Sequence, residues 1–188
     1  MRPGTIFRKF QARDGREVTL RAPQWSDLDD MLDFINSLVD ESAPILKDTK
    51  MTREGEVDWL ARLLSKIEKN QIVVVAAEVD GRFVGQSEVA PKLGRSRHVG
   101  VLGISLRDGY RDIGIGTELM REVEHQAPRL GIEIIRLDAF GSNARALHLY
   151  EKMGYKEMGR VPRGNMMNGE YFDDVIMAKN IAPHSPPG

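Results

Sequence analysis

Apolar residues recur along this chain with two periods, one typical of helices and the other typical of strands. From residue 25 to 41, and again after Thr52, they repeat every three or four positions, which predicts two amphipathic helices. Helices are also predicted at 113–127 and 143–153. Segments rich in Val and Ile, or alternating in polarity, predict strands at 17–21, 71–79, 82–90, 97–106, 132–140, 155–166 and 170–181. This order predicts a mixed α/β sheet with helices on both faces.

A single domain accounts for this pattern, because 188 residues suit one ordinary fold and contain no internal repeat. We assign residues 17–181 to the domain. Residues 1–16 are expected to be an N-terminal extension. Residues 182–188, which include three prolines, are expected to be a disordered tail.

Composition argues against several classes of function. A formal net charge of −1 gives no reason to expect binding to nucleic acid or to an anionic membrane surface. The longest apolar run, 72–77, is too short to span a bilayer, and the first ten residues lack the apolar core of a signal peptide, so we expect a cytoplasmic protein. The chain has no cysteine and only four scattered histidines, so we expect no metal site. Chemistry is therefore expected from carboxylates, hydroxyls, backbone dipoles or an organic cofactor.

A loop rich in glycine joins the strand at 97–106 to the helix at 113–127. Gly114 and Gly116 leave the backbone open where the unpaired N–H groups of a helix start could hold an anion. Leu119 stands where a dinucleotide-binding loop has its third glycine, and no lysine follows Gly116 as in a kinase-type phosphate loop. The remaining interpretations are an Arg-x-x-Gly-x-Gly phosphate loop beginning at Arg111, or a plain helix start.

Two further features lie on either side of this loop. The strand before it carries Gly100 and Gly103, which indicate a bulge, a ligand lying against the backbone, or close packing of a helix. After it, Asn143, Ala146 and Tyr150 share one face of a predicted helix. That face either meets a ligand or belongs to an amphipathic core helix.

Together, the Arg-x-x-Gly-x-Gly loop and the Asn-x-x-Ala-x-x-x-Tyr-x-x-x-Gly-Tyr motif at 143–155 resemble the GNAT superfamily of N-acetyltransferases. The similarity extends over 17–180, and the end of the chain is similar to ribosomal-protein-type, polyamine and phosphinothricin-type members. The resemblance implies a mostly antiparallel sheet with splayed central strands, in a family where homodimers are common. It also implies transfer of an acetyl group from acetyl-CoA to a primary amine of a small molecule or a protein.

The resemblance further implies which residues hold acetyl-CoA. The backbone near Arg111 and Gly114 would bind the pyrophosphate, and the strand before it would pair with the pantetheine arm. The full expected set is Ile104, Ser105, Leu106, Arg111, Asp112, Ile113, Gly114, Ile115, Gly116, Thr117, Asn143, Ala146 and Tyr150.

Catalysis of aminolysis needs an acid and a base. Tyr150 is expected to protonate the departing sulfur. Many relatives carry a Glu base on the strand before the phosphate loop, but Gly100 is expected to occupy that position here. His98 and Glu88 are the candidates for the base, although each could instead be a solvated surface residue. The missing Glu also leaves a non-catalytic acyl-CoA-binding sensor or scaffold as the alternative function.

The acceptor end is expected at 42–53 and 160–174, as is usual in this fold. Tyr171, Asp173 and Asp174 could attract a cationic amine, or could form a solvated hairpin edge.

Overall fold

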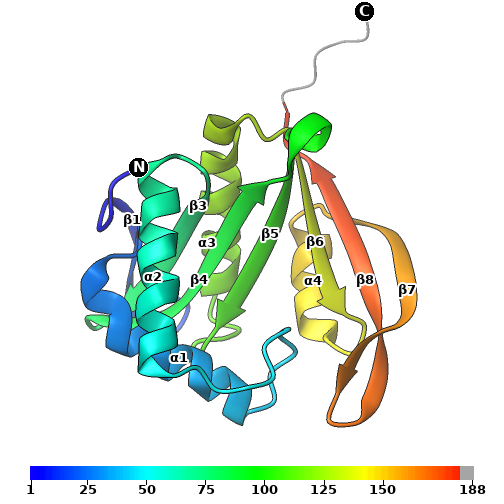
Figure 1. Ribbon diagram of the computed structural model, residues 1–188, viewed down its shortest axis with the longest axis horizontal. Helices are drawn as coiled ribbons and strands as arrows, with labels where there is room; N and C mark the ends of the chain where they lie inside the picture. Colours follow the sequence, from blue (N-terminus) through cyan, green and yellow to red (C-terminus); the bar gives the residue numbers. More distant parts are fainter. Residues whose placement is uncertain (183–188) are drawn as a thin grey trace, which may run out of the picture.

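Eight strands form one continuous sheet, in the order β1-β2-β3-β4-β5-β6-β8-β7, in the computed structural model, which describes residues 1–182 (Figure 1). The strands are β1 (Ile6–Gln11), β2 (Glu17–Arg21), β3 (Val73–Val79), β4 (Arg82–Pro91), β5 (Val99–Leu106), β6 (Ile134–Phe140), β7 (Lys156–Met167) and β8 (Glu170–Asn180). Neighbouring strands are antiparallel except for β5 and β6, which are parallel. The predicted mixed, mostly antiparallel sheet is therefore confirmed.

Helices cover both faces of this sheet, because each presents an apolar face to it. The helices are α1 (Leu28–Asp40), α2 (Arg53–Glu68), α3 (Ile115–Gln126) and α4 (Ala144–Lys152), with short 3-10 turns η1 (Trp25–Asp27), η2 (Gly94–Ser96) and η3 (Ala127–Leu130). The helices α1 and α2 bury residues such as Leu60 against Val74 and Phe83 of the sheet. On the opposite face, α3 and α4 bury Leu119 and Tyr150 (Figure 1). Among the residues that the structure describes, no helix is long and apolar enough to cross a membrane.

The strand β1 was not predicted from the sequence. It pairs with β2 in an antiparallel hairpin, with an irregular register between Ile6 and Arg8. Only Phe7 and Phe10 of its residues are partly buried, three positions apart rather than two. An edge strand with this pattern lacks the alternation by which strands are recognised. At the other end, the expected tail at 182–188 lies outside the described residues except for Ala182.

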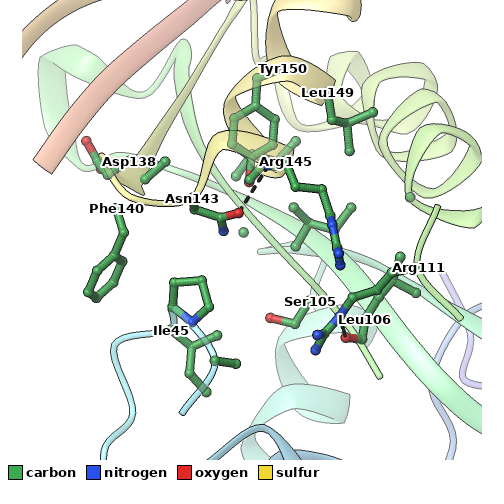
Figure 2. A pocket seen from close by; sticks show the side chains of 18 of the residues that line it. Ile45, Ser105, Leu106, Arg111, Asp138, Phe140, Asn143, Arg145, Leu149 and Tyr150 are labelled. Carbon is green, nitrogen blue, oxygen red and sulfur yellow. Dashed lines mark hydrogen bonds between the residues drawn. The ribbon is translucent and has the colours of Figure 1, made fainter. Parts of the chain in front are cut away.

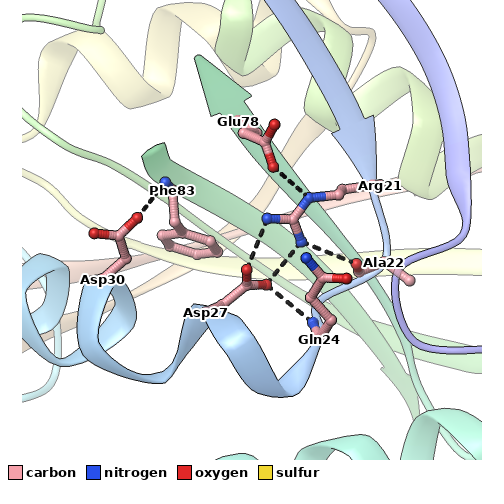
Figure 3. A network of polar contacts seen from close by, with 7 residues as sticks. All are labelled: Arg21, Ala22, Gln24, Asp27, Asp30, Glu78 and Phe83. Carbon is pink, nitrogen blue, oxygen red and sulfur yellow. Dashed lines mark hydrogen bonds and ion pairs between the residues drawn. The ribbon is translucent and has the colours of Figure 1, made fainter. Parts of the chain in front are cut away.

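A buried ion-pair network fixes the start of α1 to the sheet (Figure 3). The guanidinium group of Arg21 on β2 donates to both carboxylate oxygens of Asp27, each at 2.7 Å, and also to Glu78 of β3 at 2.7 Å. Asp27 in turn accepts a hydrogen bond from the backbone N–H of Gln24 at 2.9 Å. Arg21 and Asp27 are each 5% exposed, so the charges are paired almost entirely away from water.

The sheet forks between β5 and β6. These strands pair only where Val99–Val101 meet Ile134–Arg136, after which β5 continues along β4 and β6 continues along β8. Figure 1 shows the two strands diverging toward the connection between α1 and α2. The predicted splayed central strands are therefore confirmed, and their divergence opens the edge of β5.

Candidate active site

A cavity of about 1340 Å³ occupies the fork of the sheet. Its lining comes from β4, β5 and β6, from the loop before α3, from α4, and from the α1–α2 connection. Figure 2 shows Phe140 and Ile45 at one end of the cavity and Arg111 at the other. The cavity can therefore bring both motifs, the glycine loop and the Asn143–Tyr150 face of α4, to one ligand.

The start of α3 forms one end of the cavity. Gly114 precedes the helix with φ +97°, a left-handed conformation that favours glycine. The first helical hydrogen bond is from the N–H of Glu118 to the carbonyl of Gly114, at 3.2 Å. Within the described chain, the N–H groups of Ile115, Gly116 and Thr117 have no acceptor, so they can bind an anion.

Gly116 is closely packed at this helix start. A Cβ atom at this position would lie 3.3 Å from Cδ1 of Leu106 and 3.4 Å from Cδ2 of Leu149. Both neighbours line the same cavity as Gly116. A side chain here would therefore crowd β5 and α4 at the point where a ligand has to approach the backbone.

Arg111 holds the loop in place through its side chain. Its Nε donates to the carbonyl of Leu106 at 2.8 Å, and its guanidinium group pairs with Glu41 at the end of α1. Asp112 also lines the cavity, with φ +62° and a 3.4 Å contact to Arg145 of α4. The loop therefore contacts both α1 and α4.

Two members of the expected cofactor set can contribute only through their main chain. The side chain of Ile115 is fully buried in the core, and that of Ile113 packs against the same core. The carbonyl of Ile113 already accepts a hydrogen bond from the N–H of Arg13 at 2.9 Å.

The free edge of β5 forms the long wall of the cavity. The N–H of Arg107 donates to the carbonyl of Val84 in β4 at 2.9 Å. Because main-chain groups alternate in direction along an antiparallel strand, those of Ile104 and Leu106 face away from β4 and toward the fork. Ser105 between them also lines the cavity (Figure 2). This edge can pair with an extended ligand as a further strand would.

The helix α4 brings Asn143 and Tyr150 to the opposite wall (Figure 2). The Oδ1 atom of Asn143 caps the helix by accepting from the N–H of Ala146 at 3.1 Å, and its Nδ2 donates to no group in residues 1–182. Tyr150 is 7% exposed, and its ring meets that of Tyr155 edge-on with centroids 6.2 Å apart. Burial raises the pKa of Tyr150 to about 12, so the phenol keeps its proton.

Glu88 reaches the cavity from β4 because glycine lies opposite it. It pairs in register with Gly103 of β5, and a Cβ atom on Gly103 would lie 3.7 Å from Cγ and 3.9 Å from Oε1 of Glu88. Burial raises the pKa of the Glu88 carboxyl, and the positive charge of Lys66 opposes this only in part. A carboxylate with a raised pKa is suited to accept a proton near neutral pH.

The structure does not bring His98 to this cavity. It precedes β5, at the end of that strand opposite to the glycine loop, and lines a separate hollow with Gly131 and Glu133. The expectation for Gly100 also needs correction. A Cβ atom at position 100 would point into the core, 2.7 Å from Val89 and 2.8 Å from Ile132, whereas Val101 and Gly103 line the cavity.

The other end of the cavity, near the α1–α2 connection, mixes acidic and apolar groups. Asp138 and Phe140 of β6 and Asp174 of β8 line it, as do residues 43–47 and parts of β7. Both segments expected at the acceptor end therefore reach the cavity. Asp138 and Phe140 were not predicted as site residues. Their alternation in the sequence indicates a strand, but it does not say where in the sheet that strand lies.

Two of the three expected acceptor residues lie outside the cavity. Tyr171 is 53% exposed, and the guanidinium carbon of Arg163 lies 4.1 Å from its ring centroid. Asp173 accepts hydrogen bonds from the N–H of Arg163 at 3.2 Å and, through its carbonyl, from the N–H of Gly141 at 2.8 Å. Only Asp174 of the expected acidic residues lines the cavity.

Comparison with known proteins identifies the family. The sequence profile of the Acetyltransferase (GNAT) family matches residues 32–155. YwnH of Bacillus subtilis (strain 168), whose name is that of a phosphinothricin acetyltransferase, is 27% identical over 168 residues, which cover 88% of this chain and 100% of YwnH. The L-amino acid N-acetyltransferase AaaT of Escherichia coli (strain K12) is 31% identical over 64% of this chain and 74% of AaaT.

A solved structure shares the fold of this chain. RimL, a ribosomal L7/L12 alpha-N-protein acetyltransferase solved in complex with coenzyme A, shares the fold with a TM-score of 0.79 at 13% identity, covering 93% of this chain and 97% of RimL. The chain belongs to the GNAT acetyltransferase family. It is an acetyl-CoA-dependent N-acetyltransferase.

Proposed function

We propose that this enzyme acetylates a primary amine by direct attack on acetyl-CoA, with Tyr150 as general acid and Glu88 as general base. One observation carries the proposal. A single cavity is lined by the open start of α3, the free edge of β5, the Asn143–Tyr150 face of α4, and the carboxyl group of Glu88. These are the groups that would hold a diphosphate, an extended amide-bearing arm and a reacting thioester in sequence along one path.

The residues of the chain fit acetyl-CoA in the following way. The N–H groups of residues 115–117 would bind the pyrophosphate, because they have no acceptor within residues 1–182 and Gly116 and Thr117 line the cavity. The main-chain groups of Ile104 and Leu106 would pair with the pantetheine amides. Asn143 would donate its free Nδ2 hydrogens to a carbonyl of the same arm. The bound molecule supplies the acetyl thioester.

Glu88 would prepare the amine for attack. A free alkyl amine has a pKa of about 10.4 and is mostly protonated at neutral pH, so a base has to remove a proton. Glu88 faces the cavity across Gly103 and would accept this proton directly or through water. A carboxyl group with a raised pKa is a stronger base than an ordinary glutamate.

Tyr150 would complete the transfer at the sulfur. It lines the cavity from α4 and keeps its proton because burial raises its pKa to about 12. A buried phenol can donate this proton to a departing thiolate. Backbone N–H groups on the free edge of β5 would stabilise the negative charge that develops on the acetyl oxygen.

The acceptor would be a primary amine that carries an apolar substituent. Asp174 would supply negative charge for an ammonium group at this end of the cavity, because Asp138 is already paired with Arg136 at 2.8 Å. Phe140, Phe172 and Ile45 supply apolar walls. The names of YwnH and AaaT describe small acceptors related to amino acids, and that of RimL describes a protein N-terminus. An α-amino group is common to these acceptors, and the apolar substituent is inferred from the cavity walls alone.

An acceptor screen with detection of free thiol tests this function. The panel contains hydrophobic amino acids and their analogues, N-terminal peptides that begin with the same residues, and polyamines. Thiol release that depends on an amine with an apolar substituent is the expected result. Tight binding of acetyl-CoA without turnover of any amine would instead indicate an acyl-CoA-binding protein.

A further inference from the structure

The turn between β1 and β2, residues 12–16, is docked on the glycine loop. The N–H of Arg13 donates to the carbonyl of Ile113 at 2.9 Å. The Nη2 atom of Arg16 donates to the carbonyl of Gly109 at 2.8 Å, and the Arg16 guanidinium carbon lies 4.4 Å from the ring centroid of Tyr110. Main-chain and side-chain contacts therefore hold this turn and the loop together as one unit.

The side chain of Arg13 extends from this turn into the cavity. A Cβ atom on Gly114 would lie 3.9 Å from both Cγ and Nε of Arg13, so the guanidinium group lies beside the start of α3. Within residues 1–182 Arg13 makes no ion pair, whereas Arg16 of the same turn is paired with Asp14. A cation without a carboxylate, next to N–H groups without acceptors, favours an anionic ligand.

The hairpin also neutralises a negative charge in the first turn of α3. Glu118 lies in the first turn of α3, where its charge would repel a phosphate group. It is paired with Arg8 of β1 at 2.6 Å and with Arg121 of α3 at 2.5 Å. Two arginines of the hairpin, Arg8 and Arg13, thus make the start of α3 more favourable for an anion.

We infer that the β1–β2 hairpin is part of the cofactor site and that Arg13 binds the pyrophosphate of acetyl-CoA, an inference that rests on the proposed function. A guanidinium group can donate two parallel hydrogen bonds to phosphate oxygens. The pyrophosphate, rather than the 3′-phosphate, is assigned because Arg13 lies beside Gly114, at the helix start proposed to hold it.

Calorimetric titration of the wild type, Arg13→Gln and Lys9→Gln tests the assignment. Lys9 lies on β1 with a half-exposed side chain that does not line the cavity, so its substitution controls for the loss of one positive charge from the hairpin. We expect Arg13→Gln to weaken coenzyme A binding by about tenfold, as for the loss of one hydrogen bond to a charged group. The penalty should persist with 3′-dephospho-coenzyme A, and Lys9→Gln should bind as the wild type does.

The outcomes separate this inference from the proposed function. Failure of the wild type to bind coenzyme A would contradict both the proposed function and the role of Arg13. Wild-type binding with equal affinities for Arg13→Gln and Lys9→Gln would overturn the role of Arg13 alone. A penalty that vanishes with 3′-dephospho-coenzyme A would contradict the pyrophosphate assignment. Thermal melting of each variant without ligand checks that Arg13, an exposed residue, does not act through stability.

Discussion

At the scale of single residues, the burial of Tyr150 determines its protonation state. Its phenol is 7% exposed and its pKa is raised to about 12, so it remains a proton donor at any pH at which the protein would be assayed. We expect Tyr150→Phe to lower kcat by about 10²- to 10⁴-fold, the usual contribution of a general acid. The dissociation constant for acetyl-CoA, measured by calorimetry, should not change.

Tyr155→Phe is the matched control for that experiment. The ring of Tyr155 packs on Tyr150, but Tyr155 does not line the cavity. This variant should retain the wild-type kcat. If instead Tyr150→Phe were fully active, another group would have to protonate the sulfur.

The proposed role of Glu88 as general base predicts how the reaction rate depends on pH. The base has to be deprotonated, so kcat/KM should fall as pH decreases through the pKa of Glu88. Because burial raises this pKa, the fall should begin at higher pH than for an ordinary glutamate. Glu88→Gln should remove this acid limb and leave a low rate that follows only the ionisation of the amine. An unchanged limb in pH–rate profiles of Glu88→Gln would exclude Glu88 as the base.

Gly103 determines whether this carboxylate can be reached. Gly103→Val would place methyl groups between Glu88 and the cavity, because the Cβ position lies 3.9 Å from Oε1. We expect a lower kcat with unchanged binding of acetyl-CoA. Combined with Glu88→Gln, the substitution should cause no further loss, since both changes remove the same interaction. Additive losses in this double-mutant cycle would mean that Gly103 acts by another route.

Much of the site was predictable at this scale, because its motifs are local. Gly114, Gly116, Asn143 and Tyr150 follow one another at spacings that a loop and a helix face impose. The choice between the two candidate bases, His98 and Glu88, was not predictable, because it depends on which side chains next to β5 face the cavity. Alternation along the strand groups His98 with Gly100, but a side chain at position 100 would point into the core and His98 lines a separate hollow.

At the scale of elements, the buried pair of Arg21 and Asp27 fixes α1, and with it one wall of the cavity. Asp27→Ala would leave a buried guanidinium group without its bidentate partner. We expect the free energy of unfolding to fall by about 3–5 kcal/mol in urea denaturation. Asp29→Ala, which removes an exposed carboxylate paired with Arg53, should change it by about 0–1 kcal/mol. Similar losses in both variants would contradict the role of burial.

Elements with a strong hydrophobic period were predicted well, whereas β1 was missed. Most helices and strands from β2 to β8 bury at least one face, which a period of 3.6 or of two residues or a continuous apolar run records, although β7 is mostly exposed. In β1, by contrast, most side chains are exposed, and its place is fixed by pairing with β2 and by docking of the turn. Those contacts involve residues far along the chain, such as Ile113, and leave no local pattern.

At the scale of the whole molecule, the fork divides the sheet into two parts that meet only through the short pairing of β5 with β6. Acetyl-CoA bound as proposed would contact β5 and the α3 start on one part and α4 on the other. We expect ligand at about 100 times its dissociation constant to stabilise the fold by about 2.7 kcal/mol. Amide hydrogen exchange should slow at 104–117 and at 143–150.

The outer hairpin of β7 and β8 provides the internal control for hydrogen exchange. Its turn at Asn168 and Gly169 lies beyond the proposed contacts, so its exchange should not change. Slowing confined to one part of the sheet would mean that the ligand does not bridge the fork.

The open start of α3 and the free edge of β5 have a consequence for how such a protein can diverge. Both offer peptide groups, which every residue type possesses, so substitutions that preserve the backbone path leave these donors and acceptors in place. Selection can then alter nearly all side chains of this half of the cavity while the same nucleotide-bearing partner still fits. That is consistent with a fold shared with RimL at only 13% identity. Residues that contact the amine act through their side chains, so substitutions there change acceptor binding directly. Acceptor preference is therefore expected to change during evolution before cofactor binding does.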